Sequence, residues 1–267
     1  MAINVSDLTI TSLETITAFD ILTGDFKWVL DELQSATISN TEDSTDITGK
    51  QGRLLNTLKR NKAVTISGNN GLISGGLLAT QVGSSFEKKT TTVRYPDYLT
   101  VQGNEATTTY KAVGTAGNEI KKIIVRNADG TTGKVLEQDA TASAAGKFAY
   151  DPDTKKISFF ADDLQDGTEV SVYYDRKIEG GVVENFSDKY AEKVSLYIDA
   201  FAEDKCGNIF RIQFFVPKAD FNGNFDLEMG ENQTVHAFEA KSLAGACTAG
   251  GALWTYTVFG AEAPDVA

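Results

Sequence analysis

Hydrophobic and polar residues alternate along much of the chain, which is the pattern of β-strands with one buried face. The segment LTITSLETI (8–16) predicts a first strand, which ends before a Gly-containing turn near residues 20–25. The segment FKWVLDELQSATISN (26–40) predicts a second strand, because large apolar residues recur in it at Phe26, Trp28 and Leu30.

The same signal returns after residue 90 and continues toward the C-terminus. The sequences DPDT (151–154) and CGN (206–208) are turn signals that join neighbouring strands. The predicted strands are TTTVRY, YLTVQ, ATTTYKAV, IKKIIVRN, FAYD, KKISFF, TEVSVYYDRKI, KVSLYIDAFAED, NIFRIQFFVPKA, TVHAFEAKSL and ALWTYTVFG.

Two segments depart from this pattern. LISGGLLATQVG (72–83) predicts a short helix near 71–82, with Leu72, Ile73, Leu77 and Leu78 on one face. TEDSTDITGKQG (41–52) contains no large apolar cluster, so it predicts an exposed loop. The sequence therefore predicts a mainly β fold of two packed antiparallel sheets, sandwich-like or barrel-like, with one short α-helix. We expect a single domain over 1–267, in which 104–180 is a candidate extra lobe.

Composition fits a folded chain with a buried core, since 41% of residues are hydrophobic and 23% are charged. The net charge of -12 arises from 25 Lys and Arg against 37 Asp and Glu. This excess of acid disfavours tight wrapping of nucleic acid, which needs cationic contacts to phosphate. The N-terminal sequence resembles no secretion signal, and no apolar run has the length of a membrane span.

Charge is unevenly distributed along the chain. Between residues 47 and 86 there are five bases and no acid, whereas 220–231 contains four acids and no base. The bases are Lys50, Arg53, Lys59, Arg60 and Lys62, and the acids include Asp220, Asp226 and Glu228. These segments are either two solvated faces or complementary surfaces through which one subunit contacts the next.

The residues that usually carry catalysis or metal binding are scarce. His236 is the only histidine and lies in an alternating strand, so no histidine-rich metal site can form. The chain has no nucleophile elbow, phosphate loop or dinucleotide-binding motif. Adjacent acids such as Asp162 and Asp163 lie in predicted turns, and we expect Cys206 and Cys247 to be reduced, buried thiols. The prediction is a protein without catalytic residues, cofactor or metal.

Two stretches resemble the major tail tube proteins of long-tailed bacteriophages. One is TDITGKQGRLLNTLKRNKAVTISGNNGLISGGLLATQVG (45–83), in which a D-x-T-G-x-x-G motif precedes a strand and a helix. The other is PKADFNGNFDLEMGENQTVHAFEAKSL (217–243), followed by the aromatic strand LWTYTVF. The resemblance implies that six subunits join their sheets into a ring and that rings stack into a tube through an extended loop or hairpin and terminal arms.

By position, residues 41–62 correspond to the stacking element and residues 1–7 to an arm. The resemblance also implies a virion protein that is assembled in the host cytoplasm without a membrane. Its expected partners are further copies of itself, the tape measure, tail terminator and tail tip proteins, and phage DNA that passes through the lumen. An acidic lumen would repel the DNA backbone, so that DNA could slide through the tube.

Two other classes of protein remain open from the sequence. One is a different virion component, such as a capsid decoration or head protein. The other is a β-sandwich binding module that recognises sugars or proteins through exposed aromatic residues, for which Tyr95, Tyr98 and Tyr110 are candidates.

Overall fold

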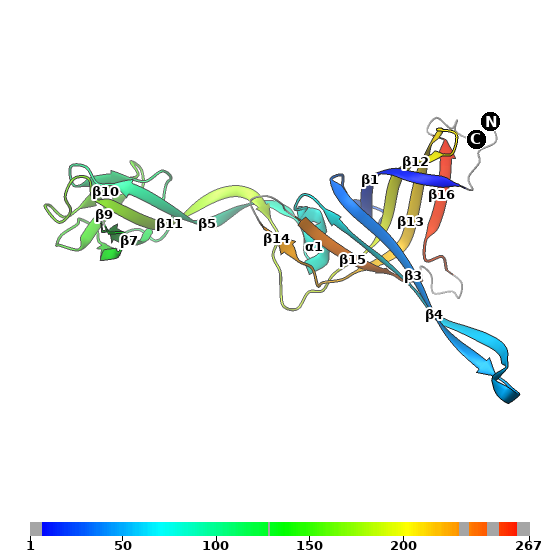
Figure 1. Cartoon of the computed structure of the whole chain (residues 1–267). Coiled ribbons are helices and arrows are strands. Elements are labelled where there is room, and N and C mark those ends of the chain that lie inside the picture. The colour runs from blue at the N-terminus through cyan, green and yellow to red at the C-terminus, as the bar shows by residue number, and fades with distance from the viewer. Residues whose placement is uncertain (1–6, 128, 230–234, 245–250, 261–267) are drawn as a thin grey trace. The chain divides into compact units, whose positions relative to one another are not determined.

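The computed structural model describes residues 7–127, 129–229, 235–244 and 251–260. The chain divides into two compact units, which are unit 1 (Met1–Glu87 and Val182–Ala267) and unit 2 (Lys88–Gly181). Each unit has its own sheet and its own core (Figure 1). Unit 2 includes all of 104–180, the candidate extra lobe. Whether the chain behaves as one domain stays a prediction.

Unit 1 contains a nine-stranded sheet in which β2-β1-β12-β13-β15-β4-β3 are neighbours, while β14 pairs with β15 and β16 pairs with β13. All its pairings with a defined register are antiparallel. Its strands are β1 (Leu8–Asp20), β2 (Phe26–Leu30), β3 (Leu33–Thr48), β4 (Leu54–Asn70), β12 (Lys193–Asp204), β13 (Ile209–Phe221), β14 (Leu227–Glu228), β15 (Val235–Ser242) and β16 (Thr255–Gly260).

Buried and partly exposed side chains alternate strictly along the central strands of unit 1, and the buried ones form its core. In β12 every second residue from Val194 to Ala202 is buried, and the residues between them are at least partly exposed. The neighbouring strands β1 and β13 contribute the buried residues Ile16 and Val216. Strand β4, further along the same sheet, contributes the buried Ile66. Because side chains of a strand alternate between its two faces, this pattern puts one face of the sheet against the core.

Helix α1 (Gly75–Val82) covers this core and contributes the fully buried Leu77. The Ser74 side chain accepts a hydrogen bond from the Leu77 N–H and caps its start, and Gly83, with φ 67°, ends it. Gly76 allows close packing, since a Cβ there would lie 2.6 Å from the Cβ of Trp28. Within the described residues this is the one α-helix, as predicted near 71–82.

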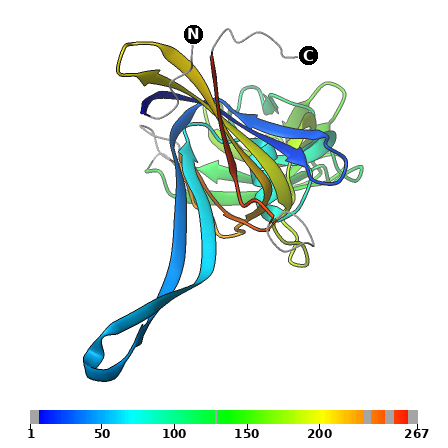
Figure 2. The ribbon, with the colours of Figure 1, turned by 90° about the vertical axis from the view of Figure 1, so that its right-hand side faces the viewer.

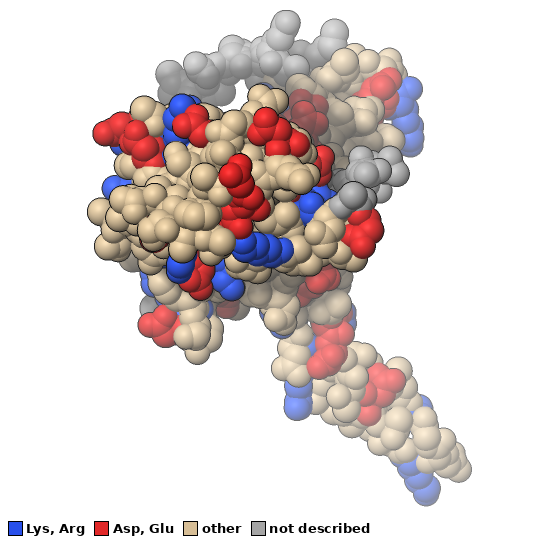
Figure 3. All heavy atoms as spheres, turned by 90° about the vertical axis from the view of Figure 1, so that its left-hand side faces the viewer, with Lys and Arg blue, Asp and Glu red and all other residues tan. Residues whose placement is uncertain are grey.

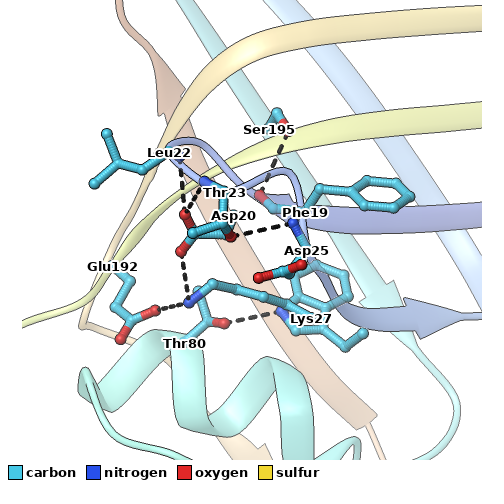
Figure 4. Close-up of polar contacts among 10 residues, drawn as sticks. Phe19, Asp20, Leu22, Thr23, Asp25, Lys27, Thr80, Glu192 and Ser195 are labelled. Atoms are coloured by element: carbon cyan, nitrogen blue, oxygen red, sulfur yellow. Dashed lines mark hydrogen bonds and ion pairs between the residues drawn. The ribbon is translucent and has the colours of Figure 1, made fainter.

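Polar contacts connect α1 to the neighbouring strands (Figure 4). The Trp28 indole donates to the Thr80 hydroxyl at 2.8 Å, and Lys27 pairs with Glu192 at 2.5 Å and with Asp20 at 3.6 Å. The Asp20 carboxylate also accepts hydrogen bonds from the backbone N–H groups of Thr23 and Leu22, which lower its pKa. The turn before β2, the helix and the start of β12 are thus held together.

Unit 2 contains a seven-stranded sheet with the order β5-β11-β7-β8-β9-β10-β6. The β8–β9 pair is parallel, while its other registered pairs are antiparallel. Its strands are β5 (Glu87–Thr100), β6 (Glu105–Thr107), β7 (Ile120–Arg126), β8 (Thr132–Gln138), β9 (Lys147–Asp151), β10 (Lys156–Phe159) and β11 (Glu169–Val182).

A buried tyrosine organises the core of unit 2. The Tyr174 hydroxyl donates to Asp97 at 3.0 Å and accepts from the Tyr110 N–H at 3.1 Å, while burial raises the pKa of Tyr174. Asp97 also accepts from the N–H and hydroxyl of Thr109. The segment before β7 is therefore fixed to the sheet by side-chain hydrogen bonds.

The mainly β fold, with two sheets and a single helix in the described residues, is confirmed. Four local expectations were wrong. The predicted strand ATTTYKAV (106–113) ends at Thr107, because the backbone N–H groups of Thr109 and Tyr110 donate to side chains and not to a neighbouring strand. Residues 26–40 form two strands, because the chain turns at the exposed pair Asp31 and Glu32. Residues 41–52 are largely strand, because their backbone pairs with β4. Leu72 and Ile73 precede α1 and are exposed, since the helix starts only at Gly75.

Candidate assembly interface

The far part of the β3–β4 hairpin, residues 41–63, extends away from the rest of the sheet (Figure 2). We call it the outer hairpin. Its strands remain paired, from Thr41 opposite Ala63 to Thr48 opposite Leu54. No residue in this segment is buried. Eight residues of strand span about 25 Å, so the outer hairpin projects well beyond the core.

The tip of the outer hairpin is a tight turn formed by the D-x-T-G-x-x-G sequence. A 3-10 turn, η1 (Lys50–Gly52), follows Gly49, whose N–H donates to the Arg53 carbonyl at 2.7 Å. Gln51 and Gly52 have φ angles of 64° and 74°. Positive φ favours glycine, which explains Gly52 in this motif.

Three large apolar side chains near the tip are exposed to solvent. Ile47 is 41% exposed, Leu54 is 55% exposed and Leu55 is 56% exposed. Burying one such side chain stabilises a contact by about 1.5–3 kcal/mol. Leu54 and Leu55 are consecutive in β4, so exposed apolar side chains lie on both faces of the ribbon near its tip, where a partner could cover them.

The outer hairpin is basic, although the chain is acidic. It has five Lys and Arg against three Asp and Glu, a net charge of +2, whereas the rest of unit 1 has seven against 20, a net charge of -13. In Figure 3 basic side chains lie at the far end of the projecting segment, with acidic ones nearer its base.

Only some of these charges are paired. Lys59 contacts Glu42 at 2.5 Å, which lowers the pKa of Glu42 and raises that of Lys59. Lys50, Arg53 and Arg60 have no ion-pair partner among the described residues. All five predicted bases lie on the outer hairpin. Lys62, near its base, also forms no ion pair with a described residue, so four of the five are available to an acidic partner.

The predicted acidic contacts lie elsewhere in unit 1. Asp220, at the end of β13, is half-buried and 3.7 Å from Lys193. Asp226 and Glu228 are exposed, and Asp226 lines a groove of about 430 Å³ on β4 and β15 together with Glu239. The structure does not bring these acids to the bases within one chain. Whether they meet between copies stays a prediction.

Among the described residues of unit 1, the end strands β2 and β3 each have one unpaired edge, and two further stretches leave backbone groups unpaired. Strand β2 pairs only with Ile16–Phe19 of β1. The edge of β1 on that side is therefore open over the preceding residues of β1, 8–15. In the described part of the chain, β16 pairs only with β13 and its other edge is open. Open edges can add a strand from another chain. Exposed apolar side chains lie close by, with Ile10 55% exposed and Tyr256 41% exposed.

His236 has a structural environment that the sequence did not reveal. Its Nδ1 accepts from the Ser74 N–H at 3.2 Å, and its Nε2 donates to the Gln81 side chain at 2.8 Å. The ring is fully buried, and burial lowers its pKa. His236 thereby joins β15 to both ends of α1. It lies opposite Asn70, the last residue of β4.

The described residues contain no group of three or more His, Cys, Asp or Glu side chains able to hold a metal ion. Cys206 is a free thiol but is exposed at the β12–β13 turn, so the expectation that it is buried was wrong. Cys247 and residues 1–6 of the predicted arm (1–7) lie outside the described residues, while Asp7 is exposed and pairs with Lys205 at 2.8 Å. In the described part of the chain, no helix combines the length and apolar character needed to cross a bilayer.

The comparisons with known proteins agree with this architecture. The model of the YomU/Tube protein family matches residues 8–256, which include both units and the outer hairpin. A comparison with curated proteins found no match.

Proposed function

The chain belongs to the YomU/Tube protein family, and we propose that it polymerises as stacked hexameric rings into the tail tube of a bacteriophage. The family match confirms the resemblance to phage tail tube proteins, which are structural components of the virion tail. The observation that carries the proposal is the outer hairpin, a projecting ribbon with exposed aliphatic residues and unpaired bases.

Ring closure would use the open sheet edges of unit 1. The free edge of β16 in one subunit would pair with the free edge of β1 in the next, residues 8–13, which extends both sheets into one continuous barrel. Backbone hydrogen bonds across that junction would satisfy groups that otherwise attract uncontrolled pairing. The exposed Ile10 and Tyr256 would be covered in the same step.

Stacking would use the outer hairpin. Its tip would contact the adjacent ring, where Ile47, Leu54 and Leu55 would be buried. The partner surface would be acidic. Its candidate residues are Asp226, Glu228 and the half-buried Asp220, which lies 3.7 Å from Lys193. Opposite charges would orient the approach, while apolar burial would supply most of the affinity.

The charge distribution supports a conduit for DNA. Apart from the outer hairpin, unit 1 has a net charge of -13. A tube lined by such a surface would repel phosphates and let DNA pass into the host during ejection. We further propose that the tube contacts the tape measure, tail terminator and tail tip proteins and is assembled in the host cytoplasm.

Negative-stain electron microscopy of the purified chain over a concentration series tests the proposal. We expect hollow tubes or stacked rings of uniform diameter, with six-fold symmetry in end views. A parallel series seeded with a purified tail-tip complex controls for an assembly that requires an initiator. Monomers at every concentration in both series would contradict the proposal.

A further inference from the structure

Unit 2 has a polar groove where β7 and β11 approach two of its turns. The groove has a volume of about 770 Å³. It is lined by Val125, Arg126, Asn127, Gly130, Gln165, Asp166, Gly167, Thr168 and Glu169. It lies outside the surfaces assigned above to assembly, and its lining does not include Tyr174 or the residues Asp97, Thr109 and Tyr110 that hydrogen-bond around it.

Backbone hydrogen bonds hold the walls of this groove in place. The Val101 N–H donates to the Thr168 carbonyl at 2.9 Å, and the Gly167 N–H donates to the Val101 carbonyl at 2.9 Å. The Gly103 N–H donates to the Asp166 carboxylate at 2.7 Å. On the other wall, the Asn127 N–H donates to the Thr131 carbonyl at 3.1 Å. A site whose walls are already ordered loses less entropy when a ligand binds.

One aromatic ring, Tyr98, lies beside the groove outside its lining residues and exposes most of its surface. Tyr98 is 65% exposed, and the Arg126 guanidinium, which lines the groove, is 5.7 Å from its ring centre. The other two candidate tyrosines are packed against each other, since the rings of Tyr95 and Tyr110 are 5.0 Å apart. The Arg176 guanidinium covers Tyr110 at 3.5 Å. Tyr98 therefore differs from them in its larger exposed surface, with Arg126 over one face of its ring and the other face open to a ligand.

The groove presents both donors and acceptors to a ligand. Arg126 and Glu169 lie opposite each other on β7 and β11, yet neither forms an ion pair with any described residue. The exposed Gln165 amide adds a donor and an acceptor. Among the lining residues there are two acids and one base, so the groove does not favour an anionic ligand.

We infer that this groove binds a neutral saccharide. A sugar ring offers a face of C–H groups that packs on an aromatic ring such as Tyr98, and hydroxyls that match planar amide, carboxylate and guanidinium groups. The single arginine disfavours nucleic acid. In an assembled tube, which rests on the proposed function, repeated copies would add avidity to a weak individual site.

Titration calorimetry on the full-length chain tests this site independently of tube formation. The probes are maltohexaose, cellohexaose and hexa-N-acetylchitohexaose, with hexagalacturonate as the acidic comparison. We expect saturable binding of at least one neutral probe, which the Tyr98→Ala variant weakens by about tenfold. The Gln165→Ala variant should also bind more weakly. Tyr190→Ala, which removes an 83% exposed tyrosine of unit 1, is the matched control and should bind normally.

Three results would overturn the inference. The first is the absence of saturable binding to every neutral probe up to about 10 mM. The second is preferential binding of hexagalacturonate. The third is unchanged affinity in the Tyr98→Ala variant. None of these results depends on whether tubes form, so a failure here is distinct from a failure of the proposed assembly.

Discussion

The two halves of the β3–β4 hairpin share the same strands but differ in surroundings. In the inner half, residues 33–40 and 64–70, Val64 and Ile66 are 1% and 0% exposed and belong to the core of unit 1. In the outer half, residues 41–63, no side chain is buried. The backbone ladder continues through both halves. Strand pairing alone therefore does not determine whether a segment contributes to the hydrophobic core.

This difference separates folding from assembly. Isolated two-stranded ribbons are only marginally stable in water, so the outer half depends on the inner half for its shape. The outer half contributes little to the core, because none of its side chains is buried. Its exposed leucines and unpaired bases gain free energy only when another molecule covers them.

The largest expected difference between the halves comes from equal truncations in β4. We expect Ile66→Ala to lower the free energy of unfolding by about 2–5 kcal/mol, because it leaves a cavity in the core. We expect Leu54→Ala to change it by less than about 0.5 kcal/mol, because that side chain is already in water. Urea unfolding of the free subunit measures both. Similar losses at the two positions would show that the outer half contributes to folding.

Charge reversal should affect only the outer half. In Arg53→Glu with Arg60→Glu, two bases without ion-pair partners among the described residues become acids, so we expect tube formation to be blocked by repulsion from an acidic partner surface. The subunit should remain folded. Lys122→Glu with Lys177→Glu makes the same charge change on exposed residues of unit 2 and should assemble normally. Sedimentation after assembly measures the polymer, and normal yield from the Arg53/Arg60 variant would refute the stacking role.

Low pH should lower the stability of the sheet next to the inner half through His236, which lies on β15 opposite Asn70 of β4. Its folded pKa is lowered by burial from the ordinary value of 6.5. Below that pH the unfolded chain binds a proton that the folded chain excludes, so stability falls as pH drops through 6.5. Protonation would also oppose the Ser74 N–H, which donates to Nδ1.

Each unit by which the folded pKa of His236 lies below the unfolded pKa corresponds to about 1.4 kcal/mol of stability. Denaturant unfolding between pH 7.5 and about 5.5 measures the slope, and a His236→Gln variant should flatten it. A slope that persists in the variant would assign the pH dependence to other groups.

Much of the fold follows from local sequence pattern. The alternation in 193–221 predicted the β12–β13 hairpin, and the residues around DPDT predicted β9 and β10. Residues 41–52 were expected to be a loop because neither face of the outer hairpin is buried, so no apolar period marks it as strand. The helix was found, but its start at Gly75 depends on the Ser74 cap.

The candidate interface was only partly visible in the sequence. The five bases were identified as a group because no acid interrupts them, and the structure places all of them on one projecting hairpin. The open edges of β1 and β16 depend on which strands pair, which local pattern does not encode. The contacts of His236 join residues more than 150 positions apart, so no short-range signal could reveal them.

Removal of the outer hairpin tests the central claim most directly. Asp43 and Arg60 lie opposite each other, so residues 44–59 can be replaced by an Asn-Gly turn without changing the register. We expect this variant to retain the thermal unfolding transition of the wild-type subunit and to form no tubes in electron micrographs. Tubes of normal length and yield from the shortened chain would contradict the claim that the outer hairpin serves assembly.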